Sequence, residues 1–237
     1  MSLVRKVYVE SGDFEVPYGV SQVMVLAVGG GAGGGTGGQG GGGSGYVKCE
    51  LLNVREKDVI PIIVGKGGAP GHNGGQTSFG TLLHAEGGYT ANGTNGGDGG
   101  SGGGAGSPLG YTECAGNGGW KGEDGLDVEP SKGGIGQKDW YIQTQNFTLN
   151  RITSGVWGSG GFVETECAAH GGGGAGGVNI DDQALLVAGN GKSSHYCEGE
   201  GGTGFGAGGG GGGTLVNMTN AEGGHGADGV VYIEFEK

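Results

Sequence analysis

A run of almost pure glycine, residues 29–45, most constrains what this chain can fold into. It reads GGGAGGGTGGQGGGGSG, and related runs return at residues 96–106, 171–177 and 208–213. Glycine has no side chain to bury and loses more conformational freedom on folding than any other residue. The runs are therefore either disordered or held by something other than a hydrophobic core.

Glycine accounts for 69 of the 237 residues, about four times its usual share. Collagen needs glycine at every third position and abundant proline, whereas these glycines come in blocks and the chain has 5 prolines. Tracts rich in glycine and serine are ordinarily flexible linkers, but the segments between these tracts have the patterns of folded strands. Disordered tails and an ordered bundle of glycine runs are thus the two interpretations to weigh.

The net charge of the chain limits the classes of partner that it can bind. The formal net charge is −12, and the 12 Lys and Arg residues form no basic cluster. A phosphate-binding surface needs the opposite sign, so nucleic acid is not expected. Residues 1–14 hold no apolar stretch long enough for a secretion signal or a membrane span. We expect no membrane insertion, and an extracellular role would then require another route, such as a virus particle.

Neither the cysteines nor the acidic residues have the spacing of a metal-binding site. Cys49, Cys114, Cys167 and Cys197 are widely spaced, whereas zinc sites usually show closely spaced ligand pairs. Free buried thiols are the simplest interpretation, and a Cys114–Cys167 or Cys167–Cys197 disulfide stays open. The acidic residues 123–129 lack the regular oxygen-ligand spacing of a calcium loop. We therefore expect no metal site.

Strand patterns surround the glycine-rich middle of the chain. Alternating or continuous apolar residues, bounded by turn signals, predict short strands. Pro61 places one of them at a sheet edge or at a bend. No long segment has the 3.6-residue period of a helix. The expected strands are Val4 to Glu10, Val20 to Val28, Tyr46 to Val54, Val59 to Val64, Thr77 to His84, Ala184 to Ala188 and Val230 to Phe235.

These patterns predict an all-β fold. We expect a β-sandwich-like body, in which the first and last strands pair, with a bundle of packed polyglycine-II helices, irregular loops and almost no α-helix. Polyglycine II has three residues per turn and no internal hydrogen bonds, so packed helices can pair one another's backbone groups. We expect one domain over residues 1–237, with 1–86 and 184–237 supplying most strands and 87–183 mainly glycine helices and loop insertions.

Several segments carry a family resemblance because they occur in a fixed order. They are Phe14-Glu15-Val16-Pro17 with Gly19-Val20, then VMVLAVGGGAGGG, GGGGSGYVK, IPIIVGKGGAPG, GGQTSFG, GTGFGAGGGGGG and the terminal GADGVVYIEF. Together they resemble the glycine-rich domains of bacteriophage tail fibres, over nearly everything except about residues 107–158. A fainter likeness is to the glycine-rich domain of anaplastic lymphoma kinase, where a Trp-containing insertion also separates the tracts.

The resemblance implies both an architecture and a function. The architecture is a β body that supports packed polyglycine-II helices, with receptor contacts in the loops at their distal end. The function is that of a virion receptor-binding protein, a tail-fibre tip or adhesin that acts outside the cell. Its partners would be a bacterial surface protein or glycan and other tail-fibre or virion proteins. A homo-oligomer, a purely structural virion or fibre component, and a surface adhesin of a cell stay open.

Aromatic side chains in polar loops are the best candidates for receptor contact, because they supply contact area at little entropic cost. The loops run around residues 111–120, 140–157 and 164–170. The same aromatics could instead cap the ends of the glycine bundle. The candidate residues are Tyr111, Trp120, Trp140, Tyr141, Phe147, Trp157, Glu164 and His170.

No set of residues converges on catalysis. A GxGxxG-like match follows the strand 20–28, where a dinucleotide-binding fold has one, but no helix can follow through this glycine run. Three of the other histidines, His72, His84 and His195, fit no known ligand or nucleophile spacing with Cys197. We therefore expect neither an enzyme activity nor a cofactor.

Overall fold

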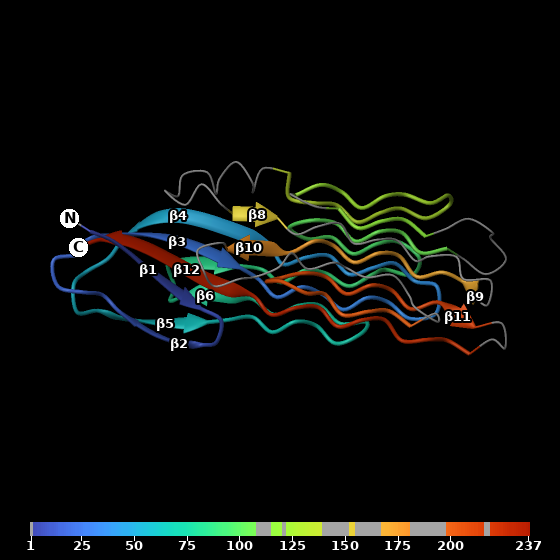
Figure 1. Cartoon of the computed structure of the whole chain (residues 1–237), viewed down its shortest axis with the longest axis horizontal. Coiled ribbons are helices and arrows are strands. Elements are labelled where there is room, and N and C mark those ends of the chain that lie inside the picture. The colour runs from blue at the N-terminus through green and yellow to red at the C-terminus, as the bar shows by residue number, and fades with distance from the viewer. Residues whose placement is uncertain are drawn as a thin grey trace.

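The structure is a computed structural model that describes residues 2–107, 115–119, 122–138, 152–154, 167–180, 198–215 and 219–237. The strands gather mainly at one end of an elongated molecule, and the glycine runs extend from them along its long axis (Figure 1). The described residues contain no helix, which confirms the all-β prediction. Accordingly, none of them forms a helix long and apolar enough to cross a membrane.

Two four-stranded antiparallel sheets form the body. β1 pairs with β12 from Leu3↔Glu236 to Tyr8↔Val231, so the first and last strands pair as predicted. The first sheet has the order β1 (Leu3–Tyr8), β12 (Val230–Glu236), β3 (Gln22–Val28), β4 (Val47–Asn53). The second sheet has the order β2 (Gly12–Glu15), β5 (Val59–Ile63), β6 (Thr77–Phe79), β7 (Leu83–Ala85).

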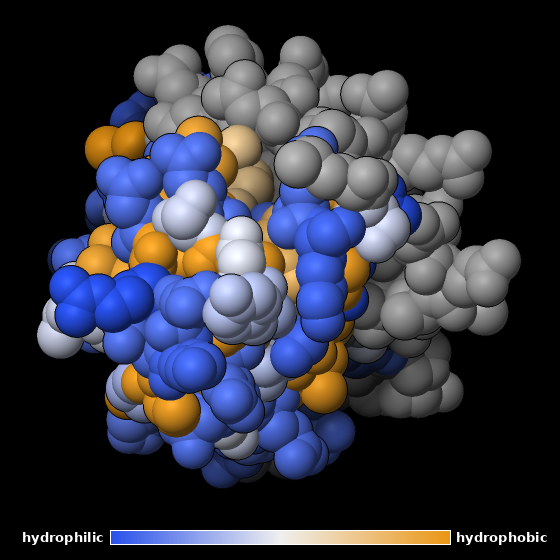
Figure 2. Space-filling model, turned by 90° about the vertical axis from the view of Figure 1, so that its left-hand side faces the viewer, coloured by the Kyte–Doolittle hydropathy of each residue, from blue (hydrophilic) through white to orange (hydrophobic). Residues whose placement is uncertain are grey.

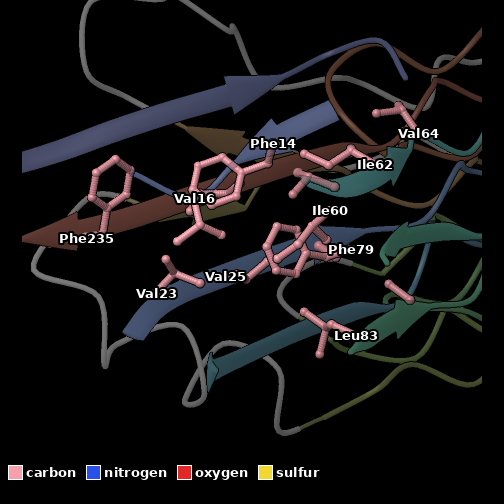
Figure 3. Packing of buried hydrophobic residues seen from close by; sticks show 14 of the residues in the cluster. Phe14, Val16, Val23, Val25, Ile60, Ile62, Val64, Phe79, Leu83 and Phe235 are labelled. Atoms are coloured by element: carbon pink, nitrogen blue, oxygen red, sulfur yellow. The ribbon is translucent and has the colours of Figure 1, made fainter. Parts of the chain in front are cut away.

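The two sheets share one apolar cluster (Figure 3). Alternation along β5 turns Ile60 and Ile62 into this cluster. Phe14 has no exposed surface, and its ring centroid lies 5.8 Å from that of Phe79 and 5.9 Å from that of Phe235. Fully burying a side chain of this kind contributes roughly 1.5–3 kcal/mol. The body therefore has a conventional core, unlike the glycine runs.

A second cluster covers the outer face of the first sheet. Leu26 and Tyr232 pack there with Val178 and Phe205 from the glycine-rich part of the chain. β3 is thus buried on both faces, which explains its nearly continuous apolar sequence. Val178 begins β10 (Val178–Ile180), which pairs with β8 (Ile152–Ser154), whereas β9 (Cys167–Ala169) pairs with β11 (Thr214–Leu215) at the far end of the glycine runs (Figure 1).

Two details of the strand predictions are wrong. β5 lies between β2 and β6, so of the two alternatives for Pro61 the sheet edge is wrong. The missing N–H costs no bond of the β5–β6 ladder, because that ladder ends at Ile62↔Phe79, while the Pro61 carbonyl oxygen accepts a bond from Gly80 N at 2.7 Å. Thr77 to His84 is not one strand, because Gly80 has a φ of 54° and the chain turns back into β7. The strand predicted at 184–188 lies outside the described residues.

The glycine runs are held by backbone hydrogen bonds whose partners rotate with a period of three residues. Successive N–H groups of the run 29–35 donate to three different neighbouring segments, and every third residue returns to the same segment. A chain with three residues per turn points its N–H groups in three directions in this way. The donor–acceptor pairs are Gly30–Gly75 and Gly33–His72, Gly31–Ala227 and Gly34–Gly224, and Ala32–Gly43 and Gly35–Gly40, with N···O distances of 2.8–3.0 Å.

The run 40–45 lies at the centre of this network. It donates to three segments, through the pairs Gly40–Gly93 and Gly43–Tyr89, Gly41–Gly104 and Ser44–Ser101, and Gly42–Gly209 and Gly45–Gly206. It accepts from three others, through the donors Ala32 and Gly35, Gly97 and Gly100, and Ala175. Three plus three segments make six neighbours around one run. Every backbone N–H of this run is paired, which replaces side-chain packing as the source of order.

Close approach of these backbones explains the glycine composition. A Cβ atom on Gly41 would overlap the Gly173 carbonyl oxygen, and one on Gly43 would overlap that of Asp98. Ser44 is accommodated because its Oγ accepts a bond from Ser101 N at 2.7 Å. The fully buried alanines in the described runs mark positions with room for one methyl group: Ala32, Ala105, Ala175 and Ala207.

The central run gives a direct test of this packing. Gly41→Ala should lower the free energy of unfolding by about 1–3 kcal/mol or more, because the added methyl group overpacks against backbone that has no flexible end to move. Urea unfolding followed by circular dichroism measures the change. Gly12→Ala is the matched control, because a Cβ atom at Gly12 meets nothing within 4 Å. Equal, small effects of the two substitutions would show that the run is not tightly packed.

Candidate functional site

The glycine runs reverse direction at two levels. One level is the junction with the sheets, and the other is the opposite end of the runs, which we call the distal end. Gly40 N donates to Gly93 O at 3.1 Å and Lys132 N donates to Asn95 Oδ1 at 2.7 Å, which places three turns, at 36–39, 92–95 and 128–131, at the distal end. Ser2 and Lys237 pair with each other at the sheet end (Figure 1).

The turn 36–39 is fixed by glycine geometry and one amide side chain. Gly37 and Gly38 have φ values of 66° and 82°, a region that favours glycine. Gln39 Oε1 accepts a bond from Thr36 N at 3.0 Å. Gly37 N and Gly38 N donate to Ala221 O and Gly212 O, at 3.2 and 2.7 Å. The turn is therefore bonded both within itself and to two neighbouring runs.

The turn 92–95 is a tight reversal with exposed amides. Asn92 N donates to Asn95 O at 3.1 Å, and Asn95 N donates back to Asn92 O at 3.2 Å. Gly93 has a φ of 61°, and both asparagines are exposed. Asn–Gly is a turn signal in sequence, but inside a glycine tract it does not stand out. Sequence reasoning missed both this turn and the turn 36–39.

Aspartate and asparagine side chains bind the outermost described run, 132–137, to its neighbours. They accept bonds from its N–H groups on two sides, and on each side the acceptors are three residues apart. This spacing matches the period of the backbone bonds in the centre. The pairs are Lys132 N–Asn95 Oδ1 at 2.7 Å, Ile135 N–Asp98 Oδ1 at 2.6 Å, Gly133 N–Asp127 Oδ1 at 2.8 Å and Gly136 N–Asp124 Oδ1 at 2.9 Å.

Two of these carboxylates also meet lysines. Lys132 Nζ lies 2.9 Å from Asp127 Oδ2, and Lys138 Nζ lies 2.9 Å from Asp124 Oδ2. The Lys132 bond and then the Gly133 N–H lower the pKa of Asp127. The Gly136 N–H, reinforced by Lys138, lowers the pKa of Asp124. Within the described residues no cluster of His, Cys, Asp or Glu could hold a metal ion, and these carboxylates bind the backbone instead.

His170 is the one predicted contact residue that the structure describes. Its side chain is 3% exposed, and its carbonyl oxygen accepts a bond from Ser107 N at 2.8 Å. Burial lowers the pKa of its imidazole. Neither His170 Nδ1 nor Ser107 Oγ has a hydrogen-bond partner in the described structure. An imidazole buried this deeply offers little surface to a receptor, so we do not count it among the contact residues.

The other predicted contact residues lie outside the described residues: Tyr111, Trp120, Trp140, Tyr141, Phe147, Trp157 and Glu164. The described residues that flank them differ in location. Ser107 precedes Tyr111 at the distal end, where it bonds to His170. Gln137 precedes Trp140 at the junction, where its side-chain amide exchanges two bonds of 3.1 Å with the backbone of Val47 in β4. The candidates therefore belong to segments that leave from opposite ends of the glycine runs.

The sheet end has a different surface from the distal turns. Figure 2 shows apolar patches among the polar side chains at this end. A groove of about 520 Å³ lies there, and its exposed apolar lining includes Leu3, Tyr18 and Leu51.

Cys49 of β4 is a free cysteine, and burial, followed by Glu50 and Glu234, raises the pKa of its thiol to about 12. The two proposed disulfides involve residues whose side chains are not described.

The glycine runs and the strands of the β body alternate along the chain, so one family model can cover both. A family model described as a glycine-rich domain matches residues 9–236. The chain belongs to this family. A comparison with curated proteins gave no match. Membership in the glycine-rich domain family covers the sheets and the glycine runs together, and the description of the family names no ligand.

The aspartate contacts of this glycine-rich domain predict how its stability depends on pH. Because the pKa values of Asp124 and Asp127 are lowered in the folded state, their contribution is complete above the pKa of unfolded aspartate, about 4. It is lost as the pH falls through their folded values. Urea unfolding midpoints should therefore fall on acidification in this range.

A double variant isolates this contribution. Asn at both positions, Asp124→Asn with Asp127→Asn, keeps an acceptor for Gly136 N and Gly133 N but does not titrate. Its unfolding midpoint should change less below about pH 4 than that of the parent chain. An unchanged pH dependence would assign the acid sensitivity to other carboxylates.

Proposed function

We propose that this glycine-rich domain is a non-enzymatic receptor-binding protein of a bacteriophage tail fibre. It acts outside the cell as part of the virion and recognises a bacterial surface protein or glycan. Polyglycine-II helices hold its turns and loops. The observation that carries the proposal is the bonding of the run 40–45 to six neighbours, with partners that repeat every three residues.

A rigid support favours binding by loops. Association costs the conformational entropy of every side chain and loop that becomes ordered in the complex. The turn 36–39 is already bonded to two neighbouring runs, and the turn 92–95 is bonded to the runs at 40 and 132. A surface held in this way loses little freedom when a receptor binds. This supports display of a binding surface over a role as a flexible linker.

The chemistry of the distal turns suits a polar receptor. Their side chains are mainly amides and hydroxyls, which can donate and accept hydrogen bonds with sugar hydroxyls or peptide groups. The two ends of the described chain lie together at the sheet end, so a fibre joined to either of them would leave the distal turns accessible. The uncharged polar side chains with exposed surface in these turns are Thr36, Gln39, Asn92, Thr94 and Asn95, and Glu129 supplies one carboxylate.

Binding of the purified, fluorescently labelled domain to a panel of bacterial strains tests the proposal. Among strains that bind, Trp140→Ala, Trp157→Ala or Tyr111→Ala should weaken binding by about tenfold or more, since central aromatic contacts usually carry most of the binding energy.

Tyr18→Ala is the control for exposed aromatics, because Tyr18 is 76% exposed at the sheet end. It should leave binding unchanged. Unfolding midpoints of all variants separate lost contacts from lost folding. If no strain binds the domain while its variants prevent particle assembly, it is instead a purely structural component of the fibre. Binding that survives all three aromatic substitutions would overturn the assignment of these loops.

A further inference from the structure

Asparagine followed by glycine is a chemically reactive pair. The backbone nitrogen of the glycine can attack Cγ of the asparagine side chain and close a five-membered succinimide ring. Two groups must be free to reach each other: the side-chain amide of the asparagine and the N–H of the next residue. Hydrogen bonds at either group hold the two groups apart. The reaction is slower where such bonds exist, because they must be broken first.

The chain has five Asn–Gly pairs. Asn190–Gly191 lies outside the described residues, and at Asn117–Gly118 the asparagine is half-buried and the glycine is buried. The asparagine is exposed in the other three pairs, which can therefore be compared. At Asn73–Gly74, Asn73 Oδ1 accepts a bond from Thr90 N at 2.9 Å, and Gly74 N donates to Gly88 O at 2.9 Å. At Asn95–Gly96, Asn95 Oδ1 accepts from Lys132 N at 2.7 Å, and Gly96 N donates to Lys132 O at 2.8 Å. In both pairs the two reacting groups are occupied.

The pair Asn92–Gly93 differs at both groups. Asn92 is exposed at the distal end, and no described residue bonds to its side-chain amide. Gly93 N likewise has no partner among the described residues, although its carbonyl oxygen accepts the bond from Gly40 N. Gly93 has no Cβ to obstruct attack through its nitrogen. Among the three pairs with an exposed asparagine, hydrogen bonds thus protect two and leave this one open.

We propose that Asn92 is a site of spontaneous covalent modification. Gly93 N forms a bond to Cγ of Asn92 and loses its proton to solvent. The C–N bond of the side-chain amide then breaks, and the departing nitrogen takes up a proton from solvent and leaves as ammonia. Water then opens the ring at one of its two carbonyls. Opening at one gives aspartate, and opening at the other gives isoaspartate, whose main chain runs through the former side chain. No oxidant or enzyme is needed, and water is the only co-reactant.

The modification changes the distal end in two ways. Both products replace a neutral amide with a carboxylate, so the turn 92–95 gains a negative charge at neutral pH. Isoaspartate also inserts a methylene group into the backbone of a turn whose reciprocal N–H···O bonds are 3.1 and 3.2 Å. A preparation of the domain therefore becomes a mixture of charge forms with age. This inference does not depend on the proposed receptor.

Incubation of the folded domain at mildly alkaline pH, followed by peptide mass spectrometry, tests the assignment. The peptide that contains Asn92 should gain the mass of the amide-to-acid change about ten- to hundredfold faster than those that contain Asn73 and Asn95, because each of the latter must first break two hydrogen bonds. The same measurement on urea-unfolded chain removes the structural protection. There the three rates should converge.

Asn92→Gln supplies the matched variant, because it retains the amide but would have to close a larger and less favourable ring. The acidic form of the parent domain in which peptide mapping finds the modified Asn92 peptide should be largely absent from this variant on ion-exchange chromatography. Modification of Asn73 or Asn95 in the folded domain at the rate of Asn92 would overturn the proposal. So would an acidic form that accumulates equally fast in Asn92→Gln.

Discussion

The obligation of every backbone N–H and C=O group to find a partner governs this structure. In an ordinary domain helices and sheets meet this requirement, and apolar side chains then pack the elements together. In the glycine runs the same hydrogen bonds pair the backbone groups and hold the runs together, because no side chain separates one backbone from the next. The run 40–45 bonds to six neighbours, so its order depends on all of them. The β body holds the runs where they enter and leave, through Tyr232, Val178 and Phe205.

The outer runs meet the same requirement with different groups. A run at the surface lacks neighbours on one side, and there aspartate and asparagine supply the missing acceptors. Asp127 and Asp124 lie three residues apart and accept from Gly133 and Gly136, also three residues apart. This explains the acidic residues near 123–129 without a bound cation. These aspartates also give the surface negative charge while they pair the backbone N–H groups of the outer run.

Part of this architecture could be predicted from sequence. Most strands of the two sheets, the pairing of the first and last strands and the absence of helix in the described part of the chain follow from apolar alternation, because those segments have side chains that report their surroundings. Sequence patterns missed β2 and the short strands β8, β9, β10 and β11. Within the glycine runs no side chain reports anything. The turns at Gly37 and Gly93 could not be distinguished from their neighbours, since only backbone geometry sets them apart. His170 bonds through its carbonyl oxygen to Ser107, which is far from it in sequence, so its place in the fold could not be predicted from its neighbours in the chain.

The placement of Pro61 shows a different limit. Sequence rules assign proline to an edge because it lacks an N–H, and this holds only if its missing donor would have faced a partner. Here β6 ends before that point, so an interior strand tolerates proline.

The contact residues proposed for a receptor rest on the character of their loops, and they remain predictions.

The order of the runs in space also bears on how the chain reaches this state. The central run receives and donates bonds to residues near 89, 104, 175 and 209, and β12 at the end of the chain lies between β1 and β3. Apart from the turns and the contact between the runs 29–35 and 40–45, most bonds of the central run join residues far apart in sequence. Closing such distant contacts is slow, because the loop entropy is lost before the contacts form. While the last residues are still being synthesised, the first glycine run has few of its final partners. The domain should therefore assemble late and cooperatively, with its longest exposure to misassembly before its final strand is inserted.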